Sequence, residues 1–134
     1  HIEALRSGRE IECPTYDFIT HCRRPETINI TPRETILLEG ILVVCRADLR
    51  ALVDGLIFVA TDVGLRHSRR VYRDQYERGR DLASIERFWA RAEDTFTEWG
   101  ALAEDTADLF VDGSADVEAM TRSVLDYLNQ RSDH

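Results

Sequence analysis

Two apolar runs, each followed by a helix-like stretch, constrain the fold of this 134-residue chain more than any other feature. Thr35–Val44 is nearly continuous apolar sequence interrupted by Glu39 and Gly40, and Leu56–Thr61 is a second such run. Strands that are buried on both faces have this composition. The order strand, helix, strand, helix therefore predicts an α/β protein with a parallel sheet.

The stretch after the second run has the pattern of an amphipathic helix. Asp62 is placed to cap its N-terminus, and the pattern continues to about Tyr76. Leu65, Tyr72 and Tyr76 form a stripe that we expect to pack inward. Four arginines share the adjacent face at i, i+3, i+4 and i+7 spacing: Arg66, Arg69, Arg70 and Arg73.

The remaining elements follow from shorter patterns. Residues 10–31 are rich in Thr, Ile, Tyr and Phe, which predicts a β-hairpin or a pair of short strands. Apolar residues recur at 3,4 spacing between Leu82 and Trp99, which predicts a helix with one packing seam. We also expect residues 1–6 to be the end of a helix, 47–53 to form a short helix and 109–111 a short strand. A final helix, capped by Ser114 or Asp116, is expected to run through Gln130.

Charge is distributed unevenly along the chain. All 17 basic residues are arginine and the net charge is −8, which disfavours nucleic-acid partners and anionic membranes. No apolar run approaches the ~20 residues of a membrane helix. Yet residues 66–80 hold six arginines against Asp74 and Glu77, whereas residues 81–120 are strongly acidic. This local excess of positive charge indicates a site for a small anion. Three cysteines without a CxxC pair favour a reducing, cytoplasmic compartment.

Three strings in this order resemble the uridine kinase (uridine–cytidine kinase) family of P-loop kinases. They are PTYDFITHCR at 14–23, EGIL at 39–42 and RRVYRDQYERGR at 69–80. The resemblance covers about residues 1–118. It implies part of a doubly wound parallel-sheet fold, with a β-hairpin over the nucleoside site and an arginine-rich helical lid. The chain then reads as one domain, 1–134, matching the C-terminal two-thirds of that fold. Within it the hairpin is 10–31, the sheet and helix core is 35–76, and the lid and C-terminal helices are 77–130.

The resemblance also implies an activity. Family members use ATP or GTP with Mg²⁺ to phosphorylate the 5′-hydroxyl of uridine or cytidine, and they are often oligomeric. By that likeness the pyrimidine base is contacted by Tyr16, Phe18 and His21, and Arg70 approaches the ribose. Arg73, Arg78 and Arg80 belong to the lid over the phosphates, and Glu39 stands near the magnesium at the end of its strand. Arginine suits this task because its fork-shaped cation matches phosphate oxygens.

Each of these residues also has an ordinary structural interpretation. Tyr16 and Phe18 share one strand face and so are also core candidates, while His21 needs a turn to join them and is otherwise a solvated loop residue. The arginine face is either a lid or a helix surface paired with the acidic 81–120 segment. Glu39 lies either at an exposed strand end or against an arginine, since an unpaired buried carboxylate is costly. Asp17 is a candidate for capping a turn or pairing with an arginine.

The phosphate-binding G-x-x-x-x-G-K-[ST] loop is missing from these residues, which contain no lysine. We therefore expect no catalytic residue here and no ATP turnover by this chain alone, with the triphosphate and metal bound largely by other sequence. The chain is then part of a longer enzyme or a truncated relative. Its predicted strands lose a neighbour, so we expect poor stability, or completion by a missing N-terminal segment or a second subunit.

Two alternatives stay open. The first is a non-catalytic binding or oligomerisation module that keeps the pocket without phosphoryl transfer. The second is a kinase of the same superfamily for another small alcohol, because Phe88-Trp89 stands where the family commonly has Gln followed by Tyr.

Overall fold

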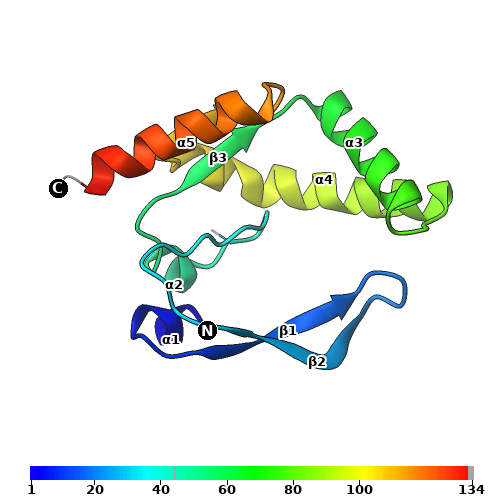
Figure 1. Ribbon diagram of the computed structural model, residues 1–134. Helices are drawn as coiled ribbons and strands as arrows, with labels where there is room; N and C mark the ends of the chain where they lie inside the picture. The colour runs from blue at the N-terminus through cyan, green and yellow to red at the C-terminus, as the bar shows by residue number, and fades with distance from the viewer. Residues whose placement is uncertain (44, 133–134) are drawn as a thin grey trace.

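The computed structural model describes residues 1–43 and 45–132, with every side chain among them except those of Ala101 and Ser132. Helices and strands are interspersed along the chain (Figure 1). In order they are α1 (Ile2–Arg6), β1 (Ile11–Asp17), β2 (Cys22–Ile30), α2 (Ala47–Arg50), β3 (Ile57–Ala60), α3 (Val63–Tyr76), α4 (Leu82–Asp105), β4 (Leu109–Asp112) and α5 (Val117–Ser132). The chain is therefore of the α/β class.

Strands β1 and β2 form an antiparallel hairpin within the segment for which we expected one. Pairing runs from Ile11 opposite Ile30 to Asp17 opposite Cys22. The register shifts between Pro14 and Tyr16, an irregularity that suits a residue without an N–H to donate. At the tip, Asp17 Oδ1 accepts the backbone N–H groups of Ile19 and Thr20 at 2.8 and 3.1 Å. These bonds close the turn that leads to β2.

Strands β3 and β4 pair in parallel, with Ile57 opposite Leu109 and Ala60 opposite Asp112. Helices α3 and α4 connect them, as a parallel pair requires a long crossover. Both strands end against Gly113, whose N–H donates to the carbonyl of Ala60 at 2.7 Å. A Cβ at this position would lie 1.9 Å from Thr61 Oγ1, so only glycine fits. The parallel sheet that we expected is present here as two strands.

Aspartates start the three long helices. The side chain of Asp62 accepts from the N–H groups of Gly64 and Leu65, which confirms the predicted cap of α3. Asp81 accepts from Ser84 N at the start of α4, and Asp116 accepts from Ala119 N at the start of α5. Among the residues that the structure describes, no helix combines the length and the apolar character needed to cross a membrane.

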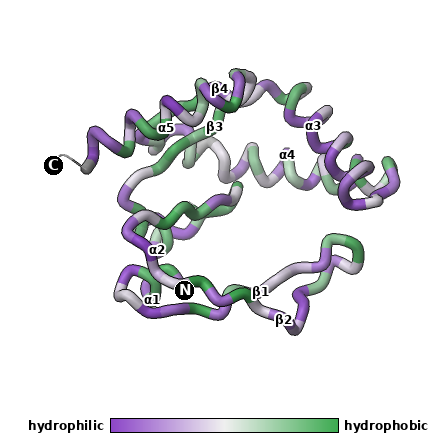
Figure 2. Tube along the Cα trace, viewed as in Figure 1, coloured by the Kyte–Doolittle hydropathy of each residue, from purple (hydrophilic) through white to green (hydrophobic). Residues whose placement is uncertain are grey.

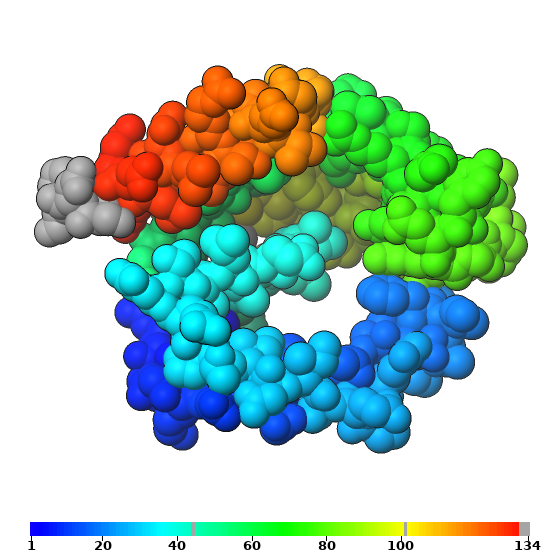
Figure 3. All heavy atoms as spheres, in the orientation of Figure 1, coloured from blue at the N-terminus to red at the C-terminus, as the bar shows by residue number. Residues whose placement is uncertain are grey.

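The apolar core is small. Of the described apolar side chains, only Leu5, Ile11, Ile85 and Val111 are buried. The accessible surface is 9875 Å², whereas a compact monomer of 15.4 kDa exposes about 7,200 Å². Figure 3 shows an opening between the hairpin, the segment that joins β2 to α2, and the helices. The elements thus surround a hollow instead of closing over one core.

The strand predicted at Thr35–Val44 is wrong for residues 35–43, which form no strand; Val44 lies outside the described residues. Leu37 is 78% exposed and Ile41 is 61% exposed. Within the described residues no strand pairs with this segment, so its backbone groups have no ladder to join. The sequence has the composition of a buried strand, but no strand among the described residues lies beside it.

The expected inward packing of Tyr72 and Tyr76 is also wrong. Their side chains are exposed, and their rings stack on each other at 4.8 Å. Helix α4 instead meets the arginine face of α3: the guanidiniums of Arg66 and Arg70 lie 5.6 and 5.9 Å from the Trp89 ring centroid. Figure 2 shows how hydrophilic residues dominate the C-terminal part of α3. Cation–π contacts from arginine therefore join α3 to α4. The sequence had predicted that Leu65 and the two tyrosines would form the inward-packing stripe.

We expect the 134-residue chain by itself to unfold over a broad temperature range, because so little apolar surface is buried in it. The measurement is thermal unfolding followed by circular dichroism, with the oligomeric state read by size-exclusion chromatography with light scattering. A monomer that melts in one sharp, cooperative transition would contradict this expectation.

Candidate functional site

Four arginines converge on one carboxylate at the end of α3. We call Arg70, Arg73, Arg78 and Arg80 the arginine cluster; they surround Asp74, whose side chain is fully buried. The Asp74 Oδ1 atom lies 2.9 Å from Arg73 Nη2 and 3.1 Å from Arg78 Nη1. The Oδ2 atom lies 3.1 Å from Arg80 Nη1 and 3.7 Å from Arg70 Nε. One negative charge thus holds four positive charges.

Local sequence explains how these arginines meet. Arg70 and Arg78 stand four residues before and four residues after Asp74, and α3 ends between them at Tyr76. Gly79 has φ +62°, a left-handed conformation that glycine adopts without strain. The chain turns back there, and Arg80 N donates to the carbonyl of Asp74 at 2.9 Å. A helix end and a glycine turn thereby place both halves of the cluster around one residue.

The charges in the cluster shift one another's ionisation. Burial would raise the pKa of Asp74, but the hydrogen bond and charge of Arg73, with the charges of Arg78 and Arg80, lower this pKa below the usual 3.8. Burial lowers the pKa of Arg70, although the charge of Asp74 opposes that effect. The carboxylate therefore stays ionised at neutral pH, and the cluster keeps an excess of positive charge.

The hairpin tip lies directly against this cluster (Figure 1). The Arg78 guanidinium lies 4.0 Å from the centroid of the Phe18 ring. Arg80 Nη2 donates to the carbonyl of Phe18 at 3.1 Å and lies 3.5 Å from His21 Nδ1. The Tyr16 ring meets the Phe18 ring edge-on at 5.3 Å. The structure thus brings together three hairpin residues and two arginines that are far apart in sequence.

His21 reaches this position through an unusual backbone conformation. Its φ is +58°, which is uncommon for a residue other than glycine. The imidazole ring lies 4.9 Å from the Phe88 ring of α4. Asp17 stabilises the turn: its Oδ1 accepts the N–H groups of Ile19 and Thr20, and its carboxylate lies 3.4 Å from the Arg24 guanidinium. Asp17 therefore takes both of the structural roles that the sequence left open for it.

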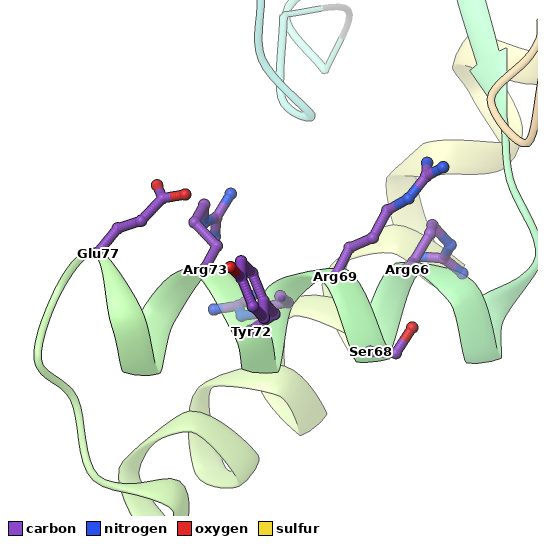
Figure 4. Close-up of a pocket in the computed structure, with 7 residues that line it drawn as sticks. Arg66, Ser68, Arg69, Tyr72, Arg73 and Glu77 are labelled. Atoms are coloured by element: carbon purple, nitrogen blue, oxygen red, sulfur yellow. The ribbon is translucent and has the colours of Figure 1, made fainter. Parts of the chain in front are cut away.

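The remaining arginines of α3 have other partners. Arg66 forms a two-bonded ion pair with Glu93 of α4 at 2.6 and 3.0 Å, and Arg69 donates to the carbonyl of Gly113 at 2.6 Å. The interpretation of a helix face paired with the acidic segment thus holds for Arg66, whereas Arg70 and Arg73 join the cluster. An open depression of about 720 Å³ runs along this face of α3. Figure 4 shows Arg69, Arg73 and Glu77 rising from the same side of the helix beside it.

Glu39 stands apart from this arrangement. It is exposed in an irregular segment, so its expected position at the end of a strand is wrong. Among the residues that the structure describes, no three His, Cys, Asp or Glu side chains lie close enough to hold a metal ion. Glu39 as a metal ligand stays a prediction from the resemblance.

Sequence reasoning missed the buried carboxylate of Asp74. This residue was visible in the sequence as the one acid between Arg66 and Tyr76, within a run of arginines. Such a residue is a natural counter-ion for the run. The sequence singled out Phe88 as a departure from the family's usual residue, but not its contact with His21, which depends on how α4 packs near the hairpin.

The chain is similar in sequence to a known family and to several curated proteins. Residues 1–119 match the model of the phosphoribulokinase / uridine kinase family. The uridine kinase of Chloroflexus aurantiacus is 40% identical over 114 residues, covering 84% of this chain and 54% of the relative. That of Lactobacillus helveticus is 36% identical, covering 96% of this chain and 64% of the relative. That of Brevibacillus brevis is 42% identical over 85 residues, covering 63% and 40%.

The chain therefore belongs to the phosphoribulokinase / uridine kinase family. It spans about half the length of the curated relatives that it matches. The resemblance that the hairpin and arginine motifs carried is confirmed at the level of the family.

We expect the Asp74 carboxyl to titrate below pH 3.8, because its arginine partners stabilise the charged form. The folded state then gains stability from this group above pH 3.8, and loses it as the pH falls through the lower, folded-state pKa. The measurement is the ¹³C chemical shift of the Asp74 side-chain carboxyl between pH 7 and pH 2. A midpoint at or above 3.8 would contradict the cluster geometry.

Proposed function

We propose that this chain is the substrate-and-lid portion of a uridine-kinase-like phosphotransferase. The whole protein would transfer a phosphoryl group from ATP or GTP, with Mg²⁺, to the 5′-hydroxyl of uridine or cytidine. Membership of the family supports the reaction class, and the names of the relatives support the nucleoside. The phosphate-binding loop is not among these 134 residues, so the proposal concerns the whole protein.

The observation that carries this proposal is the contact between the hairpin tip and the arginine cluster. Phe18 lies 4.0 Å from the Arg78 guanidinium, and its carbonyl accepts from Arg80. A flat aromatic surface beside a histidine suits a planar base with polar edges. Guanidinium groups suit phosphate oxygens and the charge that spreads over a phosphoryl group during transfer. The two chemistries that a nucleoside kinase needs therefore adjoin each other.

Residue roles follow from this arrangement. Tyr16, Phe18 and His21 would contact the base. Arg70 would approach the ribose and its 5′ end, and Arg73 and Arg78 would meet the phosphates. Arg80 would act between the two groups, because it contacts both Asp74 and the hairpin.

A second candidate is a kinase of the same superfamily that acts on another small alcohol. The contact that favours it is the one between His21 and Phe88. One face of the imidazole ring is covered by an apolar ring at a position where the family commonly has glutamine. A pocket lined by Phe88 there has one fewer side chain that can hydrogen-bond to the edge of a base.

Calorimetry on the whole protein separates these substrates. We expect heat of binding with uridine and cytidine, and none with unrelated polyols at the same concentration. Binding of a polyol but not of either nucleoside would favour the second candidate. Nucleoside binding without any transfer from ATP or GTP would instead indicate a non-catalytic binding module.

Two substitutions in the whole protein test the residue roles. Arg73→Ala is expected to lower kcat about a hundredfold, which corresponds to ~3 kcal/mol of transition-state stabilisation, with a small change in nucleoside KM. Phe18→Ala is expected to do the reverse, because it removes a contact with the base. Steady-state kinetics with varied uridine measures both effects, and the assignment fails if neither variant differs from the wild type.

A further inference from the structure

Asp74 is the one charged side chain that is buried among the described residues. It lies on α3, a helix on which hydrophilic residues dominate. A carboxylate without water around it is costly unless it is fully paired. Its position therefore needs an explanation that the substrate roles of the neighbouring arginines do not provide.

Its two oxygens link different parts of the chain. Arg70 and Arg73 come from α3, while Arg78 and Arg80 come from the loop after the helix. Each oxygen contacts one arginine from each part: Oδ1 lies between Arg73 and Arg78, and Oδ2 lies between Arg70 and Arg80. Without the carboxylate, four like charges would face one another and repel. Asp74 is thus the connection between the helix and the loop.

The cluster keeps binding capacity on its outer side. A carboxylate accepts about four hydrogen bonds, whereas four guanidiniums offer about twenty N–H donors. The Arg73 side chain is 43% exposed, and that of Arg78 is 24% exposed. An anion can therefore reach arginine donors while Asp74 stays covered beneath them.

We infer that Asp74 is a positioning residue, which fixes the four guanidiniums of the arginine cluster as a preformed unit without touching the substrate. This inference rests on the proposed role of those arginines in binding phosphate. Donors that are held in place before the reaction need no reorganisation when charge develops, which is the source of their catalytic effect. Asp74 also acts on the hairpin, because Arg78 and Arg80 are the arginines that contact Phe18.

The alternative role, simple neutralisation of charge, has the opposite consequence. If Asp74 only reduced the positive potential, its removal would strengthen binding of the triphosphate and leave kcat unchanged. If it positions the arginines, its removal lowers kcat although the net positive charge rises. The direction of the effect therefore distinguishes the two roles.

The test is Asp74→Asn in the whole protein. We expect kcat for phosphoryl transfer to fall about 10- to 100-fold, because small displacements of contributing groups have effects of this size. Nucleoside KM should change less than kcat, by under about threefold, because Asp74 reaches the hairpin only indirectly, through Arg78 and Arg80. Asp94→Asn is the matched control: it removes the same charge from an exposed position on α4 and should leave both constants unchanged.

A second readout is independent of activity. Arg73 Nε donates to Asp74 Oδ1 at 2.9 Å, so its proton should exchange with water more slowly than the Nε proton of the exposed Arg33. In ¹⁵N NMR spectra of the whole protein we expect this exchange to accelerate at least about tenfold in Asp74→Asn. Equal exchange at Arg73 and Arg33 in the wild type would overturn the inference.

Other outcomes are equally decisive. Kinetics of Asp74→Asn that match those of Asp94→Asn, or a lower triphosphate KM with unchanged kcat, would also overturn it. Should Asp74→Asn fail to fold, Asp74→Glu takes its place: this variant keeps the charge but moves the carboxylate by one methylene, and an unchanged kcat would count against positioning. If the wild type transfers no phosphoryl group to uridine or cytidine, the proposed function fails, while the exchange measurement still decides the role of Asp74.

Discussion

The attraction between Asp74 and the arginines around it organises the contact between the end of α3 and the hairpin tip. It joins the end of α3 to the loop that follows, and through Arg78 and Arg80 it holds that loop against the hairpin tip. These segments have no large apolar core between them. Charge pairing in a buried setting is directional and needs correct geometry, so it fixes positions that apolar packing would leave variable.

The same principle extends along α3. Its contact with α4 uses the Arg66–Glu93 ion pair and the arginine faces over Trp89 where a typical amphipathic helix uses aliphatic side chains. Arginine serves this purpose because its planar group stacks on aromatic rings while its edges still donate to carboxylates. Helix α3 therefore places arginine side chains on two sides: one faces α4, and the other lines the open depression.

The hairpin tip and the arginine cluster come from two segments whose sequences resemble uridine kinases. The motifs that resemble uridine kinases lie at 14–23 and 69–80, and the fold brings them into contact across a long sequence separation. The segment 39–42 carries the third motif, yet Glu39 is exposed there and takes no part in the assembly. Two of the three motifs therefore meet within the described residues.

Local interactions could be predicted from the sequence because each depends on a few neighbouring residues. The cap at Asp62, the extent of α3 and the pairing of β1 with β2 are of this kind. Three features were decided only by the tertiary structure. Asp74 is buried, and residues 35–43 form no strand. Arg66 and Arg70 face α4, where the sequence had placed Tyr72 and Tyr76. Spacing reports which residues share a face, but burial and strand pairing depend on a partner from elsewhere in the fold, and no local pattern encodes whether that partner is in place.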